Sequence, residues 1–514
     1  MPMDTATTAP KTGMQKLLDT VERVGNQVPH PVMIFVYLIG SIIVLSTLLS
    51  VFGAKVSYQA YNAATGNIEP AFTEARSLLT IDGIRFMYTG VVANFMGFTA
   101  VGVIIIAMVG VGVAEEAGLV KVLIRKLVIV APRWALTWIL TFIGIISSIA
   151  ADAGYLVLIP LAAAAFLSVG RHPLAGLAVG FASVASAFLV NILIVPVDGI
   201  LTEITNDAIR LVNPNQSIDL AANLWFSIGS VVMLTVLIVV ITERVIEPRL
   251  GKYTGDYQVP GENVLSEAEY RGLRYAGYGL LGVLGFIALL LLPPGAPLRN
   301  PTTGAIISGS PFMNSLIVTI ALIFLVTGAA FGRGAGTLKT SGEIIGAIQK
   351  AISGLSGLIL LLLVISQFIA FFNYTNMATL AAVSAARFLE WLNLPSIALI
   401  IGFVIAVFGI DLIITAAIAK WAIFAPVFVP LLMQLGVEPE VVLAAYRVGD
   451  SPMNSITPLN AYFAMIVTFA IKYQKEAGVG TVIALMLPYV IWISVIWTAF
   501  LAGWYLLGLP WGIG

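Results

Sequence analysis

The sequence contains no cysteine and only two histidines, His30 and His172, among its 514 residues. The missing cysteines exclude disulfides and thiolate metal sites, and the scarcity of histidine argues against a histidine-dependent membrane enzyme. Charged residues are also few, at 10% of the chain, whereas soluble domains carry about 25%. The net charge of zero gives no sign of a nucleic-acid partner. With 59% hydrophobic residues and a mean hydropathy of +1.00, the chain is expected to reside in a lipid bilayer.

Long apolar runs predict an all-α polytopic membrane protein. A spanning helix needs about 20 apolar residues, and nine spans are expected near residues 31–53, 95–117, 174–210, 221–246, 275–293, 314–332, 353–373, 441–471 and 481–508. Two more apolar stretches, 135–169 and 395–434, are interrupted by SSIAADAG and GIDLIITAAIAKW. Each half is too short to span comfortably, so both stretches are predicted to be re-entrant helical hairpins. Such backbone lies at membrane depth only where protein buries it or a watery cavity adjoins it.

The distribution of basic residues orients this map. With a cytoplasmic N-terminus, the predicted inner segments hold 18 of the 26 lysines and arginines and the outer segments hold 6. Lys420 and Arg447 fall within membrane segments. Cytoplasmic loops carry the excess of basic residues, so the bias supports a multi-pass protein whose N-terminus is cytoplasmic. Basic, partly apolar stretches at 119–134 and 378–393 suit helices that lie along the membrane interface.

The two hairpin regions align with each other. IPLAAAAFLSVGRHP, residues 159–173, matches APVFVPLLMQLGVEP, residues 425–439, at a constant offset that also places Tyr155 on Trp421. After a three-residue slip, Asn191 falls on Asn454. The copies start on opposite sides of the membrane, which predicts an inverted-topology repeat. Secondary transporters with such repeats bind their solutes near the bilayer midplane, at discontinuous helices.

The predicted organisation has five parts. They are a cytoplasmic N-terminal segment (1–30), the first span and outer loop (31–94), a first repeat (95–246) with hairpin 135–169 and broken span 174–210, a cytoplasmic linker with scaffold spans (247–352), and a second repeat (353–508) with hairpin 395–434 and broken span 441–471.

Ionisable residues inside spans are functional candidates, because each costs about 2.5–3.5 kcal/mol to insert. The six that stand out, all in hairpin breaks or broken spans, are Asp152, Asp198, Asp411, Lys420, Arg447 and Asp450.

The stretch YRVGDSPMNSITPLN, residues 446–460, concentrates these groups. Arg447, Asp450 and Asn454 fall on one helical face, and Pro452 and Pro458 should break the helix. The freed carbonyls, with carboxylate and amide oxygens, suit a small hard cation. Asp450, Asn454 and, from the first repeat, Asn191 are therefore candidate Na⁺ ligands. The alternative is that Arg447 and Asp450 pair merely to make insertion tolerable.

The remaining candidates occupy the hairpin breaks and the first broken span. Asp152, with Ser147 and Ser148, either caps a half-helix or binds the coupling ion. Asp411 is a second ion-coupling candidate. Thr415, Lys420 and Trp421 follow it and can hold an aryl carboxylate; alternatively, Lys420 offsets Asp411 while Trp421 packs in the core. For Asn191 the alternative is an interhelical hydrogen bond, and for Asp198 a helix end at the outer interface.

Several stretches resemble the AbgT family of p-aminobenzoyl-glutamate transporters over nearly the whole chain. The most specific is AKWAIFAPVFVPLLMQLGVEPE…AAYRVGDSPMNSITPLNAYF, residues 419–463, supported by SLLTIDGIRFMYTGVVANFMGF, VGVGVAEEAGL, DAGYLVLIPLAAAAF and GRHPLAGLAVGFA. The resemblance implies a bowl-shaped homodimer with nine spans and two hairpins per subunit, in the bacterial inner membrane. It places the family's functional residues on Trp421, Arg447, Asp450, Asn454 and Pro458, and its acid in the first broken span on Asp198.

The resemblance implies transport of p-aminobenzoyl-glutamate, p-aminobenzoate or sulfonamide-like antimetabolites, driven by protons or Na⁺. The expected partners are membrane lipid, a small aromatic or carboxylated solute and a second copy of the chain, with no cofactor beyond a coupling ion. The chain departs from the family before AKW, where DLIITAAI replaces an asparagine followed by a Gly/Ser-rich run. A Na⁺-coupled dicarboxylate carrier and an ion channel are the alternatives. No nucleophile–base pair of an enzyme is visible.

Overall fold

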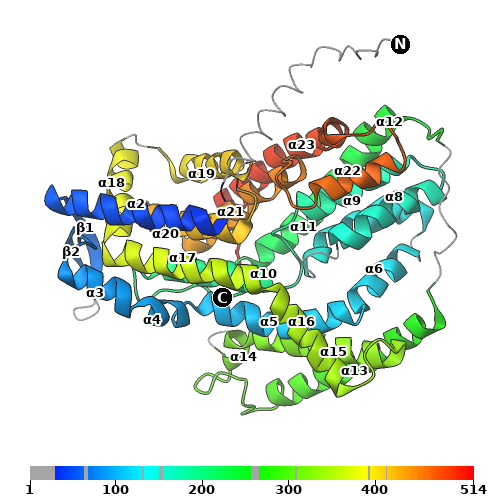
Figure 1. Cartoon of the computed structure of the whole chain (residues 1–514), viewed down its shortest axis with the longest axis horizontal. Coiled ribbons are helices and arrows are strands. Elements are labelled where there is room, and N and C mark those ends of the chain that lie inside the picture. Colours follow the sequence, from blue (N-terminus) through cyan, green and yellow to red (C-terminus); the bar gives the residue numbers. More distant parts are fainter. Residues whose placement is uncertain are drawn as a thin grey trace, which may run out of the picture.

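The computed structural model of this chain is almost entirely helical (Figure 1). It describes residues 29, 31–62, 67–129, 132–149, 154–255, 265–306, 310–391, 394–412 and 414–513. Asp152 and nearly all of the predicted N-terminal segment 1–30 lie outside the described residues.

The first half of the chain contains the first predicted hairpin and the first broken span. Its main elements are α2 (Pro31–Val51), β1 (Lys55–Asn62), β2 (Asn67–Glu74), α3 (Ile81–Thr89), α4 (Val91–Met96), α5 (Thr99–Glu116), α6 (Leu119–Ile129), η1 (Arg133–Ala135), α7 (Leu136–Ile146), η2 (Ser147–Ile149), η3 (Gly154–Leu158), α8 (Ile159–Ser168), α9 (Pro173–Ala185), α10 (Pro196–Ile209), α11 (Leu224–Ile241), η4 (Thr242–Ile246) and α12 (Glu247–Leu250).

The second half contains the second hairpin and the second broken span. Its elements are α13 (Glu267–Leu291), α14 (Pro311–Asn314), α15 (Leu316–Ala335), α16 (Ser341–Gly354), α17 (Ser356–Tyr374), α18 (Met377–Trp391), α19 (Ser396–Asp411), α20 (Ala417–Gln434), α21 (Pro439–Asp450), η5 (Pro452–Ser455), α22 (Phe463–Ile471) and α23 (Val479–Leu506).

Eight described helices are long and apolar enough to cross a membrane. Seven of them, α2, α5, α11 with its continuation to Leu250, α13, α15, α17 and α23, coincide with predicted spans. The eighth is α20, an arm of the second hairpin, with 18 residues. The expectation that every hairpin arm is too short to span is therefore wrong for α20. The total of nine spans and the inverted repeat remain predictions.

Both predicted breaks occur where the polar and proline residues stand. The first broken span divides into α9 and α10, and Pro196 begins α10 because proline fits the first helical turn. The second divides into α21, the short η5 and α22, with Pro452 at the start of η5. In each hairpin, too, two helices flank the polar break: α7 and α8 in the first, α19 and α20 in the second. The breaks leave backbone groups available for tertiary contacts.

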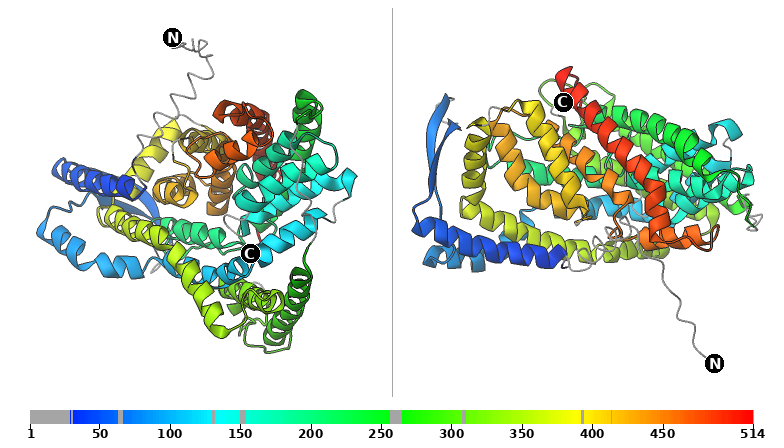
Figure 2. Two further views of the ribbon diagram at one scale, coloured as in Figure 1. Left: turned by 45° about the vertical axis from the view of Figure 1, so that its right-hand side comes forward. Right: turned by 90° about the horizontal axis from the view of Figure 1, so that it is seen from above.

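The outer loop contains a feature that the sequence analysis missed. β1 and β2 form an antiparallel two-stranded sheet in which Lys55 pairs with Glu74 and Asn62 with Asn67. The sheet stands at one end of the molecule, beside α2 and α18 (Figure 2). The Arg387 side chain of α18 donates a 2.9 Å hydrogen bond to Ser57 Oγ of β1, which ties the sheet to this helix.

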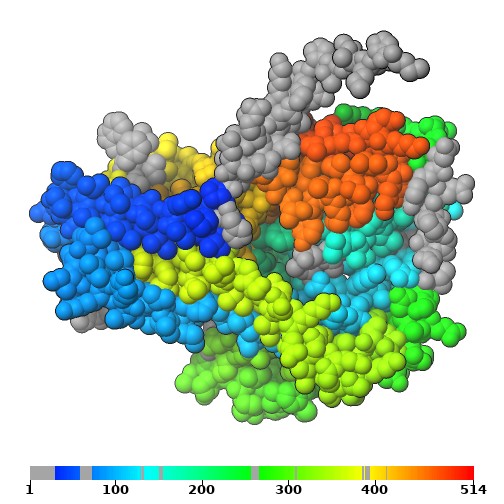
Figure 3. Space-filling view, viewed as in Figure 1, coloured from blue at the N-terminus to red at the C-terminus, as the bar shows by residue number. Residues whose placement is uncertain are grey.

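The hydrophobic core has two main parts. The larger cluster joins the hairpins, broken spans, α2, α11, α17 and α23, and the smaller one lies between α5, α6, α13, α15 and α16. Figure 3 shows α2 lying along α17 on one face, with the orange residues around α22 to their right. Phe35 of α2 packs edge-on against Phe368 of α17, with ring centroids 5.4 Å apart. Hairpins and breaks are thus enclosed between longer helices.

Close packing of α5 against α15 gives the first testable prediction. A Cβ atom on Gly110 of α5 would overlap the backbone carbonyl of Ala321 in α15. Gly110→Ala should therefore push the helices apart and lower the free energy of unfolding by about 1–3 kcal/mol. Thermal unfolding of the purified protein in detergent measures the effect. Gly102→Ala, on the same helix but facing open space, is the control and should leave the midpoint unchanged; equal midpoints for both variants would contradict the packing argument.

Candidate solute-binding site

A cavity of about 470 Å³ lies where both hairpin tips meet both broken spans. Ser148 and Ile149 line it from the first hairpin, and Thr415 to Ala419 from the second. Pro196 lines it from the first broken span and Asn454 from the second. No charged side chain is among the described lining residues.

The opposite wall of the cavity is apolar. It is formed by α5 through Ile104, Met108 and Val111, and by α17 through Leu358 and Leu361. These side chains offer no hydrogen-bond donor, and the thioether of Met108 is at most a weak acceptor. The cavity lining is therefore mostly apolar, with a few polar side chains from the hairpin tips and the second break.

Two tyrosines stack at the edge of the cavity. The rings of Tyr155, from the first hairpin, and Tyr462, from the second broken span, have centroids 4.2 Å apart and planes within 14°. Both line the cavity. Flat aromatic faces favour aromatic ligands, because stacked or edge-on ring pairs add about 0.5–1.5 kcal/mol beyond burial. An aromatic solute would find a matching surface here.

Directly behind the second hairpin tip, Lys420 bridges two carboxylates. Its Nζ pairs with Asp411 Oδ1 and lies 2.8 Å from Asp450 Oδ1. All three side chains are almost fully buried. Tyr446 lies beside them, with its hydroxyl oxygen 2.9 Å from Asp450 Oδ1 and 2.6 Å from the Ala417 carbonyl. Lys420 therefore offsets Asp411, as in the alternative interpretation of this segment.

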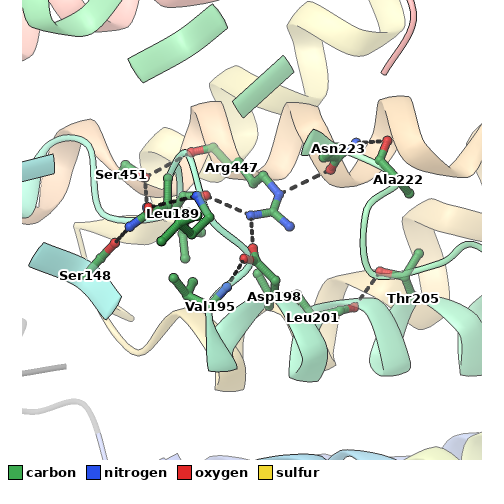
Figure 4. Close-up of polar contacts among 12 residues, drawn as sticks. Ser148, Leu189, Val195, Asp198, Leu201, Thr205, Ala222, Asn223, Arg447 and Ser451 are labelled. Atoms are coloured by element: carbon green, nitrogen blue, oxygen red, sulfur yellow. Dashed lines mark hydrogen bonds and ion pairs between the residues drawn. The ribbon is translucent and has the colours of Figure 1, made fainter. Parts of the chain in front are cut away.

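Arg447 pairs with Asp198 of the first broken span and not with Asp450. Its guanidinium donates to Asp198 Oδ1 at 2.6 Å and to the Leu189 carbonyl at 2.8 Å, and its Nε donates to Asn223 Oδ1 at 3.2 Å (Figure 4). The other Asp198 oxygen accepts the Val195 backbone N–H at 2.8 Å. The suggested Arg447–Asp450 pair is therefore wrong: each takes a different partner, from α10 and α20 respectively.

Serines connect the two broken spans at their breaks. Ser186 Oγ donates to Ser455 Oγ at 2.8 Å, and Ser451 Oγ accepts from the Leu189 backbone N–H at 3.3 Å. Together with the bond from Arg447 to Leu189, these contacts join residues more than 250 positions apart. The breaks of the two broken spans thus form one polar unit.

The predicted Na⁺ ligands share only part of a site. Asn454 donates to the Asp450 backbone carbonyl at 3.1 Å. Asn191 instead donates to the Ile146 carbonyl and to Ser148 Oγ, both at 3.0 Å, and so ties the first break to the first hairpin. This contact is the interhelical hydrogen bond that was the alternative interpretation of Asn191. Among the described polar contacts, none joins Asn191 to Asp450 or Asn454.

Trp421 is fully buried and lies outside the cavity lining. Its indole N–H faces α10, 3.0 Å from Thr205 Oγ1 and 3.2 Å from the Leu201 carbonyl. Its ring packs against Tyr446, with centroids 4.4 Å apart. Pro458 lies in the break before α22, and it too is absent from the lining. Of the predicted solute-binding residues, Thr415 alone lines the cavity, together with the ion candidate Asn454.

Three members of the site, Tyr446, Tyr462 and Asn223, were not predicted from the sequence. Tyr446 stands next to Arg447, and one helical turn separates it from Asp450, so helical spacing was an available signal. Asn223 lies in the loop before α11, where nothing in its neighbourhood distinguishes it from an ordinary loop residue.

Comparison with known proteins decides the family. A family model described as the AbgT putative transporter family matches residues 16–514. The chain belongs to this family. It is a multi-pass membrane transporter and not an enzyme.

AbgT relatives agree with this assignment along their full length. The p-aminobenzoyl-glutamate transport protein of Escherichia coli K12 is 34% identical over 500 residues, which cover 97% of this chain and 96% of the relative. The YdaH transporter of Alcanivorax borkumensis is 40% identical, with a TM-score of 0.88 over 94% of this chain and 100% of that one. MtrF of Neisseria gonorrhoeae, described among antimetabolite efflux pumps, is 38% identical, with a TM-score of 0.89 over 95% and 97% of the two chains.

The buried tryptophan of this AbgT transporter gives a second prediction. Trp421→Phe keeps the ring packing but removes the N–H that faces α10, so we expect a loss of about 0.5–1.5 kcal/mol in unfolding free energy together with slower transport. Thermal unfolding and solute flux measure the two effects. Trp134→Phe, at an 80% exposed position, serves as the control. Unchanged stability and flux in Trp421→Phe would leave the indole N–H without a role.

Proposed function

We propose that this transporter is a cation-coupled secondary carrier for a small aromatic solute bearing a carboxylate or sulfonamide group. Its solutes would be p-aminobenzoyl-glutamate, p-aminobenzoate or sulfonamide-like antimetabolites, as the names of its relatives suggest. H⁺ or Na⁺ would drive the transport. The single observation that carries the proposal is the cavity between both hairpin tips and both broken spans, with its stacked tyrosines.

The lining supports an aromatic solute over an aliphatic dicarboxylate such as succinate. The described lining residues include no cation, while Lys420 and Arg447 are engaged with carboxylates behind the lining. An aliphatic dicarboxylate in this cavity would have no positive partner for its carboxylates and no ring contact to offset the cost of burying them. The proposed solutes meet the same cost at their carboxylates, but the contacts of their ring offset part of it. An aromatic ring gains from both the tyrosine pair and the apolar wall.

The setting of the carrier follows from the same proposal. We place it in the bacterial inner membrane as a homodimer, with its N-terminus in the cytoplasm, in keeping with the excess of basic residues in the predicted inner loops. The coupling cation would bind at the polar unit of the two breaks and change which side of the membrane the cavity faces. The transport of solute and cation would be coupled because both bind to one conformational state of the carrier in preference to the other.

Reconstituted protein tests the proposal. Purified protein in liposomes should accumulate radiolabelled p-aminobenzoate, p-aminobenzoyl-glutamate or a sulfonamide when a pH or Na⁺ gradient is imposed, and succinate should not compete. Tyr462→Leu should weaken solute binding about 2- to 10-fold through loss of the ring contact, whereas Tyr462→Phe should retain it. No accumulation of any of these solutes under either gradient, or competition by succinate, would overturn the assignment.

A further inference from the structure

A second cavity, of about 910 Å³, lies beside the C-terminal half of α10. The loop 216–222, the start of α21 and the C-terminal residues 508–512 also line it. None of its described lining residues is shared with the solute-binding cavity. The predicted topology places these segments at the outer ends of spans, so the cavity is expected to face the outer side of the membrane.

Negative charge dominates the lining of this second cavity. Its four carboxylates are those of Glu203, Asp219, Glu438 and Glu440. None of them forms an ion pair within the part of the chain that the structure describes. The cation of the described lining, Arg210, is engaged elsewhere, because its Nη1 lies 2.7 Å from Asp207 Oδ1. The cavity therefore has a large excess of negative charge without a positive partner.

The carboxylates act on one another across the cavity. The charges of Glu438 and Asp219 both act on Glu440, although Asp219 belongs to the loop and the other two to the start of α21. A concave surface that carries one sign of charge concentrates its electric field and attracts ligands of the opposite sign. A positively charged ligand would relieve the repulsion among these groups.

An independent sign of a missing partner is the hydroxyl group of Thr202. This residue of α10 lines the cavity and is only 2% exposed. Thr205, on the next turn, donates to the Leu201 carbonyl at 2.7 Å, whereas the Thr202 hydroxyl makes no hydrogen bond to any described residue. A buried hydroxyl without a partner is unfavourable, and its oxygen can accept an N–H from a ligand. The polar wall thus offers an acceptor as well as charge.

The C-terminal residues provide a fixed apolar wall. The Trp511 carbonyl accepts the Trp225 backbone N–H at 3.0 Å, and a Cβ atom on Gly512 would overlap the Ala221 carbonyl. The chain end is therefore packed closely against the loop before α11. Trp511 itself lines the cavity, together with Leu509. Aromatic faces attract cations, and apolar surface accommodates the methylene stems of long amines.

We propose that this cavity binds an aliphatic di- or polyamine, with its ammonium groups at the carboxylates and its methylene chain against Trp511. Because the carboxylates come from α10, the loop and the start of α21, several separated ammonium groups match them better than one compact ion does. The Thr202 hydroxyl accepts a hydrogen bond from one of these groups. The inference goes beyond the proposed function, since the site is distinct from the solute-binding cavity and takes a ligand of opposite charge.

Binding of radiolabelled spermidine to the purified full-length protein tests the proposal. Equilibrium dialysis in detergent at low ionic strength should show saturable binding that unlabelled spermidine displaces and an equal concentration of Mg²⁺ does not. Glu440→Gln combined with Asp219→Asn should weaken this binding about tenfold or more, because two charged acceptors are lost. Thr202→Val should weaken it about 2- to 10-fold. Glu267→Gln, at an exposed position in the first turn of α13, is the control and should match the wild type.

Thermal unfolding provides a second measurement that does not depend on any transported solute. Spermidine should raise the midpoint of the wild type and of Glu267→Gln, and raise it less in the double variant. Absence of saturable binding would overturn the site. Displacement by Mg²⁺, or a Thr202→Val variant with wild-type affinity, would show only general attraction of cations to a negative surface and would overturn it as well. Wild-type affinity in the double variant would mean that spermidine binds elsewhere.

Discussion

Lys420→Met is expected to abolish transport and to cost about 3–5 kcal/mol of unfolding free energy, because removal of one member of a buried ion pair leaves uncompensated charge. The effect should be large here, since this ammonium serves both Asp411 and Asp450. Solute counterflow in liposomes and thermal unfolding in detergent measure the two losses. Lys350→Met, which removes a 70% exposed partner of Glu116, should change little, as is usual for surface ion pairs.

Neutralising the carboxyl groups should restore the fold without restoring transport. In Lys420→Met combined with Asp411→Asn and Asp450→Asn, no buried charge remains in the cluster, and replacing whole buried ion pairs is often tolerated. We expect thermal stability to return toward that of the wild type while gradient-driven flux stays absent. A triple variant as unstable as Lys420→Met would mean that lysine packing, and not charge, holds this region together.

Arg447→Met should have an effect of similar size on the other side of the site. It leaves Asp198 buried without its cation and removes the donors to Leu189 and Asn223. A loss of about 3–5 kcal/mol is expected, together with loss of counterflow, because Arg447 joins the two broken spans. Arg85→Met, which disrupts an exposed pair with Asp82, is the matched control.

A double-mutant cycle isolates the Arg447–Asp198 pair. We expect Arg447→Met with Asp198→Asn to be less destabilised than the sum of the two single variants, with a coupling energy of about 0.5–3 kcal/mol. The same cycle run with Asp450→Asn in place of Asp198→Asn should give a smaller value, because Arg447 and Asp450 bind different partners. Equal coupling in both cycles would contradict the observed pairing.

Local chemistry made the hairpins and the broken spans predictable from the sequence. Proline and polar residues interrupt apolar runs at 147–153, 186–198, 411–416 and 451–460, and the helices end at or near those positions. The β1–β2 sheet was also predictable from the local sequence, because polar and apolar side chains largely alternate in KVSYQAYN and a glycine precedes the second strand. The strands were not predicted, because the long apolar runs on both sides of the loop indicate membrane-spanning helices.

The sequence did not predict which charged residues form ion pairs with each other. Helical spacing places Arg447 near Asp450, yet the guanidinium binds Asp198, which is 249 positions away. The choice depends on how α10 packs against α21, and one sequence contains no record of that contact. The burial of Trp421 against α10 is a tertiary result of the same kind.

The apolar wall of the cavity has a mechanical consequence. The lining side chains of α5 and α17 are hydrocarbon or thioether groups, so they give the serine- and arginine-linked breaks almost no directional bonds. Movement of the breaks along this wall would therefore break few hydrogen bonds; the bond from Thr99 of α5 to Glu203 of α10 is one that it would break. The remaining resistance to such movement comes from the fit of hydrocarbon side chains, which can form again at a new position. A polar residue at Met108 or Leu358 should slow this movement, because its hydrogen bond to the breaks would have to be broken and formed again in each transport cycle.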